Sequence, residues 1–437
     1  MGIAQEDALD LPYNSNADYH ERAVLVGVEL DRDGSIHADD SLEELKALAQ
    51  SAGATVTATV RQKLKEIDPR TFIGRGKTAE ARSLAHDSGA SLAIFDDALS
   101  PAQARNLERE LNLRVIDRSQ LILDIFAQRA RTLEGKLQVE IAQLSYLQPR
   151  LTRQWTHLSR QTGGAGSSGG RIGTRGPGET QLEVDRRRVR ERLARLRERL
   201  RSVERTRALQ RRRRLEVPYP TIALVGYTNS GKSTLMNALT GAGVEVADRP
   251  FSTLDPTVRR LVLPGRIQVM LVDTVGFIHR LPHTLVEAFK ATLEEVRTAN
   301  LLLHVVDASS PLRAERMEIV DRVLEEIGAG AAPRLMVMNK IDRMGDGMMA
   351  PRGLDSVNVS ALKGEGLDEL RERMARLFAA QRQEVRVTLP VGRGDLVALA
   401  RRDGQILSEE YCDGTVSMRA VVSAPLAGRL RRAQIAS

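Results

Sequence analysis

The chain has 437 residues, 42% of them hydrophobic, 28% charged and 3% aromatic, with a formal net charge of +8 and a single cysteine, Cys412. So long a chain predicts two to four domains, and the lone cysteine excludes an intrachain disulfide framework and a cysteine-rich zinc site. The first residues lack a signal-peptide pattern and no apolar run reaches the ~20 residues of a membrane span, so we expect a cytoplasmic protein.

Residues 1–117 alternate short apolar runs with helical patterns. The runs "RAVLVGVEL", "ATVTATV", "SLAIFDD" and "LRVIDR" are typical of strands, and the segments between them are typical of helices. This alternation predicts a small α/β domain with a mainly parallel sheet. Its glycine turn "IGRGK", Ile73 to Lys77, could contact a phosphate, but it lacks the context of a dinucleotide site, which favours a surface turn.

Residues 118–214 change to long helical patterns whose apolar positions mostly recur three, four or seven residues apart. Two such stripes joined by a loop predict an antiparallel helical hairpin with a buried seam. Pro149 should kink the first helix, and Trp155 lies on its apolar stripe, which favours core packing over stacking on RNA. We interpret the glycine-rich tip, residues 161–181, as a pliable cationic contact element.

The positive charge of the chain is concentrated in the second helix of this hairpin. Residues 186–214 hold 15 arginines against three glutamates, so the rest of the chain carries a net negative charge. A dense arginine stripe is expected where a protein binds a phosphate backbone, because each neutralised phosphate releases counterions. The alternative is a solvated helix face. We predict an RNA partner bound through its phosphates, since the low aromatic content disfavours base-stacking platforms.

A phosphate-binding loop is predicted near the start of residues 215–380. The string "TIALVGYTNSGKSTLMNALT" places G-x-x-x-x-G-K-[ST] after a strand and before a helix, the context that such a loop requires. Backbone N–H groups of residues 229–233 would surround the phosphates, Lys232 would reach the β and γ oxygens, and the Ser233 hydroxyl would coordinate Mg²⁺. The motif predicts a nucleoside triphosphate without specifying its base.

Three downstream motifs indicate the base and complete the metal site. "IQVMLVDTVG" ends a strand in Asp273, expected to hold Mg²⁺ through water, and Gly276, whose N–H would meet the γ-phosphate. "RLMVMNKID" places the Asp342 carboxylate where it can accept the N1–H and N2–H of guanine, which adenine does not offer. "VNVSAL" adds Ser360 and Ala361, with the Ala361 N–H placed to meet guanine O6.

The segment "DRPFSTLDPTVRR" lies where a GTPase needs a threonine that joins the Mg²⁺ shell only while the γ-phosphate is present. Thr253 is the first candidate and Thr257 is the alternative. The residue after Gly276 is Phe277, where Ras-like enzymes carry a glutamine that orients the attacking water. Intrinsic hydrolysis should therefore be slow and depend on an external partner. A further hypothesis is that Asn229 helps to bind K⁺ beside the phosphates.

Residues 381–437 contain two strand-like runs around a short helix and predict a small α+β domain. The expected fold class is therefore α/β. It combines an N-terminal α/β domain over 1–117, a basic helical hairpin over 118–214, a P-loop GTPase domain with a mostly parallel sheet over 215–380, and this C-terminal domain.

This arrangement resembles the HflX family of translational GTPases over most of the chain. The resemblance is carried by "GRGK", "GGRIGTRGPGETQLE", "GYTNSGKST", "FSTLDPTVRR", "DTVGFI", "NKID" and "SAL". It implies a ribosome-associated factor that binds GTP and GDP and contacts the 23S RNA and proteins of the large subunit. It also implies that the hairpin tip extends toward the peptidyl-transferase region and that 70S ribosomes are split under stress such as heat. We expect a monomer.

The predicted site has catalytic, metal-binding and nucleotide-binding residues. The catalytic residues are Lys232, Thr253 and Gly276, and the direct Mg²⁺ ligands are Ser233 and Thr253. The nucleotide-binding residues are Gly226, Tyr227, Thr228, Asn229, Ser230, Gly231, Lys232, Ser233, Phe251, Ser252, Thr253, Leu254, Asp255, Asp273, Thr274, Val275, Gly276, Asn339, Lys340, Ile341, Asp342, Ser360 and Ala361.

Two other functions stay open at this point. The hairpin could act on immature RNA in a large-subunit assembly or RNA-remodelling GTPase. It could also serve as a coiled-coil interface in a regulatory GTPase with a protein partner. An ATPase activity would be secondary, because Asp342 favours guanine.

Overall fold

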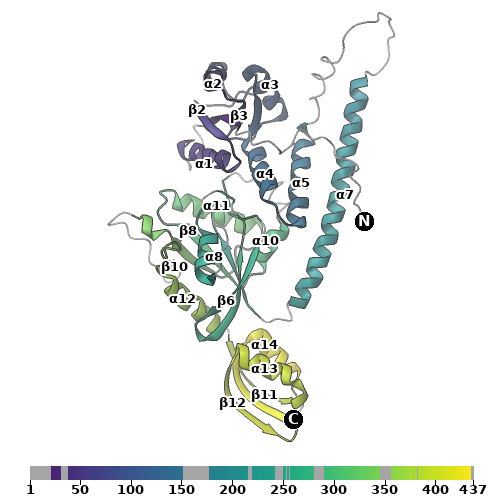
Figure 1. Cartoon of the computed structure of the whole chain (residues 1–437), viewed down its shortest axis with the longest axis vertical. Coiled ribbons are helices and arrows are strands. Elements are labelled where there is room, and N and C mark those ends of the chain that lie inside the picture. Colours follow the sequence, from purple (N-terminus) through teal and green to yellow (C-terminus); the bar gives the residue numbers. More distant parts are fainter. Residues whose placement is uncertain are drawn as a thin grey trace, which may run out of the picture. The chain divides into compact units, whose positions relative to one another are not determined.

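The computed structural model describes residues 21–30, 38–150, 177–214, 219–241, 250–251, 253–254, 256–279, 290–344, 356–380 and 382–434. The chain divides into two compact units, Met1–Ile122 and Leu123–Ser437, and each is described by itself (Figure 1). Among the helices in the described ranges, none is both long enough and apolar enough to cross a membrane.

The first unit contains a four-stranded sheet in the order β2-β1-β3-β4, and all its neighbouring strands are parallel. Every residue of the third strand is buried, as is usual for a parallel sheet. The predicted α/β fold is therefore confirmed. The strands are β1 (Arg22–Leu30), β2 (Thr55–Leu64), β3 (Leu92–Phe95) and β4 (Arg114–Asp117), and the helices are α1 (Ala38–Ser51), α2 (Arg75–Ser88) and α3 (Pro101–Leu111).

The glycine turn "IGRGK" is built into this unit. Gly74 is the N-cap residue of α2, and Ile73 is fully buried in the core with Phe95 and Leu107. Arg75 and Gly76 are exposed, as expected for a surface segment, but the segment begins a helix and the buried Ile73 anchors it to the core of the sheet.

The helical hairpin forms from α5 (Leu133–Leu147) and α7 (Pro177–Arg214), preceded by α4 (Arg118–Arg129). The predicted seam exists, and an ion pair between Arg192 and Glu140 crosses it, with 2.9 Å between Nη2 and Oε1. Pro149 does not kink α5, because the helix already ends at Leu147. Trp155 and tip residues 161–176 lie outside the described residues. The buried seam consists of Leu137, Leu144, Val189, Leu193 and Leu196.

The next domain is built on a six-stranded sheet in the order β10-β9-β8-β5-β7-β6. Only the edge strand β6 is antiparallel to its neighbour, so the mostly parallel sheet is confirmed. The strands are β5 (Thr221–Val225), β6 (Thr257–Leu263), β7 (Ile267–Asp273), β8 (Leu301–Asp307), β9 (Arg334–Asn339) and β10 (Ser356–Asn358).

Helices complete this domain, and the predicted motifs follow the carboxyl ends of β5, β7 and β9. Ligands of open α/β sheets bind outside the carboxyl ends of their strands. The α-helices are α8 (Lys232–Thr240), α10 (Lys290–Arg297), α11 (Arg313–Glu326) and α12 (Leu367–Ala379), and short 3₁₀ helices are η2 (Pro264–Arg266) and η3 (Ile341–Arg343).

The C-terminal domain has an antiparallel sheet in the order β11-β13-β12, with one face packed against two helices (Figure 1). It is the predicted α+β domain with one strand and one helix more than expected. The missed strand, β12, is mostly exposed, so it lacks a clear apolar alternation. The elements are β11 (Arg382–Pro390), η4 (Val391–Arg393), α13 (Gly394–Asp403), β12 (Gln405–Cys412), β13 (Thr415–Ser423) and α14 (Ala424–Arg432).

Candidate nucleotide-binding site

The loop between β5 and α8 has a backbone that requires glycine at two positions. Gly226 has φ of 152°, and a Cβ there would collide with the carbonyl oxygen of Val305. Gly231 has φ of 92°, and a Cβ there would collide with the side-chain amide of Asn339. Both glycines therefore permit close approach as well as a left-handed conformation. The loop ends at Lys232, the first residue of α8, so its N–H groups gather at a helix N-terminus.

The Lys232 side chain is enclosed by this loop. It is 6% exposed, and its Nζ donates to the carbonyl oxygens of Gly226 at 3.1 Å and Tyr227 at 2.8 Å. Burial lowers the pKa of Lys232 to about 8, although the nearby Asp273 carboxylate acts in the opposite direction. A polyphosphate in the loop would favour the charged ammonium, because an opposite charge nearby raises the pKa of a lysine.

Three oxygen-bearing side chains converge beside the loop. The Ser233 hydroxyl lies 2.8 Å from the Thr253 hydroxyl and donates to the Asp273 carboxylate at 2.7 Å, and Thr253 donates to the same oxygen at 3.0 Å. Burial raises the pKa of Asp273, and in the described part of the chain its Oδ1 has no hydrogen-bond partner. Hard oxygen ligands around a buried carboxylate suit Mg²⁺, so these residues fit that ion.

The two threonine candidates are placed differently. Thr253 contributes its hydroxyl to the oxygen cluster, whereas Thr257 begins β6 and pairs along the backbone with Asp273. The geometry therefore favours Thr253 as the metal-binding threonine. Its neighbour Phe251 has a φ of 58°, a conformation that is rare for a bulky residue, and its ring packs edge-to-face on Phe126, with 4.6 Å between the centroids.

The segment that follows β7 lies directly on the loop. A Cβ at Gly276 would come within 2.9 Å of the Thr228 Cα and 3.0 Å of the Lys232 Nζ, so only glycine fits there without a shift. The next residue, Phe277, is 2% exposed, donates its N–H to the Gly226 carbonyl at 3.1 Å and accepts from the Thr228 N–H at 2.7 Å. Phe277 is not among the described residues that line the central cavity.

The opposite side of the site is built on the ends of β9 and β10. The Asn339 amide donates to the Ser230 carbonyl at 2.9 Å, and the Ala361 N–H donates to the Asn339 Oδ1 at 3.0 Å. The Ser360 hydroxyl donates to the Asp342 carboxylate at 2.6 Å. A guanine O6 would have to share or replace Asn339 as the acceptor of the Ala361 N–H.

Lys340 joins this side of the site to the phosphate loop. It has a φ of 64°, and its ammonium contacts the Asp307 carboxylate at 2.8 Å and donates to the Asn229 carbonyl at 2.7 Å. Although burial alone would raise the pKa of Asp307, hydrogen bonds from Lys340 and Ser309 hold it below its usual value. The lysine stem is thereby fixed along one wall of the cavity.

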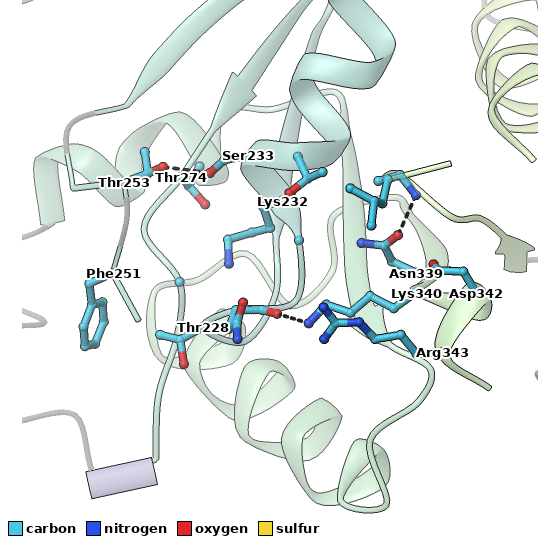
Figure 2. A pocket seen from close by; sticks show the side chains of 16 residues that line it. Thr228, Lys232, Ser233, Phe251, Thr253, Thr274, Asn339, Lys340, Asp342 and Arg343 are labelled. Carbon is cyan, nitrogen blue, oxygen red and sulfur yellow. Dashed lines mark hydrogen bonds between the residues drawn. The ribbon is translucent and has the colours of Figure 1, made fainter. Parts of the chain in front are cut away.

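These elements enclose a cavity of about 330 Å³. Figure 2 shows Lys232 between the Ser233, Thr253 and Thr274 side and the Asn339 to Arg343 side. The predicted residues that line it are Thr228, Asn229, Gly231, Lys232, Ser233, Phe251, Thr253, Thr274, Gly276, Asn339, Lys340, Asp342 and Ala361. Thr234, Arg343 and Leu362 also line it and were missed. Thr234 and Leu362 end the quoted strings "GYTNSGKST" and "SAL" at positions to which the motifs assign no role, and Arg343 directly follows "NKID".

Other predicted residues support the cavity or fall outside the description. Asp273 and Ser360 reach it through hydrogen bonds to lining residues, and Thr274, which lines it, also donates to the Leu224 carbonyl at 2.6 Å. Ser252 and Asp255 lie outside the described residues. The predicted residues that are not among its lining residues are Gly226, Tyr227, Ser230, Leu254, Asp273, Val275, Ile341 and Ser360.

Comparisons with known proteins also identify a GTPase, and the matches extend over most of the chain. Family models match residues 39–127, described as GTP-binding GTPase N-terminal, 129–214, described as GTP-binding GTPase Middle Region, and 221–340, described as 50S ribosome-binding GTPase. The chain is 45% identical over 412 residues to the GTPase HflX of Caldanaerobacter subterraneus, covering 94% of this chain and 93% of that one. It is 46% identical over 411 residues to the GTPase HflX of Escherichia coli, covering 92% and 93%. The chain therefore belongs to the HflX family of GTPases and is a GTP-hydrolysing enzyme.

Proposed function

We propose that this GTPase binds the large ribosomal subunit through its arginine-rich hairpin and, in its GTP-bound form, splits 70S ribosomes under stress such as heat. The observation that supports the proposal most is the outward face of α7. The family model that matches the nucleotide-binding domain carries the description of a 50S ribosome-binding GTPase, which agrees with such a partner.

The arginines of α7 lie away from the apolar seam. Eight of the arginines whose side chains the structure describes are exposed, whereas Val189, Leu193 and Leu196 of the same helix are buried against α5. A helix repeats every 3.6 residues, so the seam occupies one side and the charges are spread over the others. This surface suits a phosphate backbone that approaches from outside the hairpin. The exposed arginines are Arg187, Arg188, Arg190, Arg195, Arg197, Arg199, Arg201 and Arg205.

The geometry of the cavity supports a role for each group in GTP hydrolysis. Lys232 would hold the β and γ oxygens, and the Gly276 N–H would contact the γ-phosphate. Ser233 and Thr253 would bind Mg²⁺, with Asp273 acting through water. When bound, Mg²⁺ neutralises charge on the phosphates. Water attacks the γ-phosphorus, the bond to the β–γ bridging oxygen breaks, and GDP and phosphate are released.

Phe277 provides a reason for dependence on a partner. Its side chain has no hydrogen-bonding group and is buried, so it cannot orient the attacking water as a glutamine would. Another group must place the water or supply positive charge. A large RNA particle bound to the hairpin is the partner that we propose to stimulate hydrolysis.

We also propose a K⁺ ion beside Asn229. This residue belongs to the phosphate loop, is exposed and lines the cavity, and its side chain carries an oxygen that could bind a cation. GTP turnover should be at least about fivefold faster in KCl than in NaCl, because a second cation would add charge stabilisation in the site. Replacing Asn229 by alanine should remove the difference between the salts. Equal turnover of the parent protein in both salts would exclude this ion.

Sucrose gradients test the splitting of ribosomes directly. Purified 70S particles are mixed with the protein and a non-hydrolysable GTP analogue, and most of the 70S peak should separate into subunits. A variant with Arg190, Arg195, Arg197, Arg199 and Arg201 replaced by glutamine should leave the 70S peak intact. Its affinity for the 50S subunit should fall by about 10²-fold or more, because five phosphate contacts are lost.

The matched control replaces the same five arginines by lysine, which keeps the charge and should preserve most of the splitting. An intact 70S peak with the parent protein bound to 50S subunits would contradict splitting and favour the assembly function. Binding to 50S subunits that is equal for the glutamine variant and the parent would contradict the hairpin as the RNA contact and favour a protein partner.

A further inference from the structure

Tyr227, the second residue of the phosphate loop, does not direct its side chain toward the nucleotide. It is 6% exposed and is absent from the described residues that line the main cavity. Instead it borders a small separate cavity together with Arg316 and Val320 of α11. A loop whose backbone serves the phosphates thus carries a large polar side chain on its other side.

The Tyr227 hydroxyl reaches the segment that follows Gly276. It accepts a hydrogen bond from the His279 N–H at 2.9 Å. The Arg316 guanidinium lies 5.1 Å from the centroid of the tyrosine ring, so a cation–π contact fixes the ring from the side of α11. The side chain therefore connects the phosphate loop, the segment after β7 and helix α11.

Two backbone hydrogen bonds also join these two segments. The Phe277 N–H donates to the Gly226 carbonyl at 3.1 Å, and the Thr228 N–H donates to the Phe277 carbonyl at 2.7 Å. Those two bonds use only backbone groups. The hydrogen bond at His279 differs from them, because it depends on the side-chain hydroxyl of Tyr227.

We propose that Tyr227 is a positioning residue that holds Gly276 in place to contact the γ-phosphate, and that it thereby favours GTP over GDP. The inference rests on the proposed γ-phosphate contact of the Gly276 N–H. Gly276 lies against Thr228 and near the Lys232 ammonium, and the tyrosine fastens the chain three residues later. A segment that is already ordered loses less conformational entropy when the γ-phosphate binds, which strengthens binding of the triphosphate selectively.

Tyr227→Phe tests this role, because it removes the hydroxyl and keeps the buried ring. The measurement is the dissociation constant for a non-hydrolysable GTP analogue and for GDP, both with Mg²⁺. The analogue should bind about fivefold to tenfold more weakly, as expected for one lost hydrogen bond, while GDP affinity stays within about twofold. Arg316→Gln removes the cation–π contact. It should also weaken the GTP analogue relative to GDP, by a smaller factor than Tyr227→Phe does.

Tyr411→Phe is the matched control. Its hydroxyl donates to Glu409 at 2.7 Å in the C-terminal sheet, so the change removes a hydrogen-bonded hydroxyl outside the nucleotide site and should alter neither affinity. Equal weakening of both nucleotides by Tyr227→Phe would reveal a merely structural role and overturn the proposal, as would unchanged affinities.

Gly276→Ala separates this proposal from the assignment on which it rests. The added Cβ should weaken the GTP analogue more than GDP, because it intrudes where the γ-phosphate contact is made. If Gly276→Ala weakens the GTP analogue relative to GDP and Tyr227→Phe does not, only the positioning role fails. If Gly276→Ala also leaves the affinity for the analogue relative to GDP unchanged, the γ-phosphate contact itself is wrong.

Discussion

Replacing Asp342 by asparagine is expected to lower the affinity for GTP by about 10²-fold to 10³-fold and to create affinity for xanthosine triphosphate. The carboxylate can accept two hydrogen bonds, from the N1–H and N2–H of guanine. An asparagine amide presents an NH₂ group where one of those donors arrives, so the pair becomes donor against donor. Xanthine has an oxygen in place of the 2-amino group and restores a complementary pair.

The contacts of Asp342 suggest that this substitution changes base recognition without disturbing the fold. The Ser360 hydroxyl donates to its carboxylate at 2.6 Å, and an asparagine oxygen can accept the same bond, so the surrounding fold should be kept. Fluorescent-nucleotide titration with GTP and xanthosine triphosphate measures the exchange. Asp368→Asn is the matched control, because that carboxylate is 96% exposed on α12 and should change neither affinity. Retention of full GTP affinity in Asp342→Asn would contradict the assignment of the base pocket.

Much of the nucleotide site could be predicted because its parts are local in sequence. Gly226, Gly231 and Lys232 belong to one turn between a strand and a helix, and Asn339 and Asp342 follow the end of one strand. The backbone conformation of such turns permits only certain residue types, so a short sequence motif is enough to predict the local geometry. The parallel sheet then brings the strand ends together at one edge.

Other features depend on contacts between distant residues and have no local signal. The ring of Phe251 meets that of Phe126, and the Tyr227 hydroxyl meets the His279 N–H. The Ala361 N–H is bound by Asn339, which the motif letters do not indicate. Strand β12 was missed for a different reason, since most of its residues are exposed and show no apolar period.

The largest effect expected of a partner is on GTP turnover. Phe277 is 2% exposed and cannot bind water, so the protein alone should hydrolyse GTP slowly. A partner that places the water or adds a positive charge contributes roughly 10³-fold or more in other GTPases, and we expect stimulation of at least about 10²-fold by ribosomal particles. The stimulation should fall with added salt, because the arginines of α7 would bind RNA through its phosphates.

The five-arginine variant separates this effect from intrinsic activity. Arg190, Arg195, Arg197, Arg199 and Arg201 lie on the hairpin and outside the nucleotide cavity, so their replacement by glutamine should leave turnover without ribosomes unchanged. Stimulation should be lost in this variant and retained when the same residues are lysines. A glutamine variant stimulated as strongly as the parent would show that the hairpin is not the contact.

The most direct test is therefore GTP turnover of the full chain measured alone, with purified 50S subunits and with 70S ribosomes, at fixed Mg²⁺ and K⁺. We predict slow turnover alone and at least about 10²-fold faster turnover with either particle. Rapid turnover without particles, or the same rate with and without them, would contradict the proposal that this GTPase is completed by the ribosome.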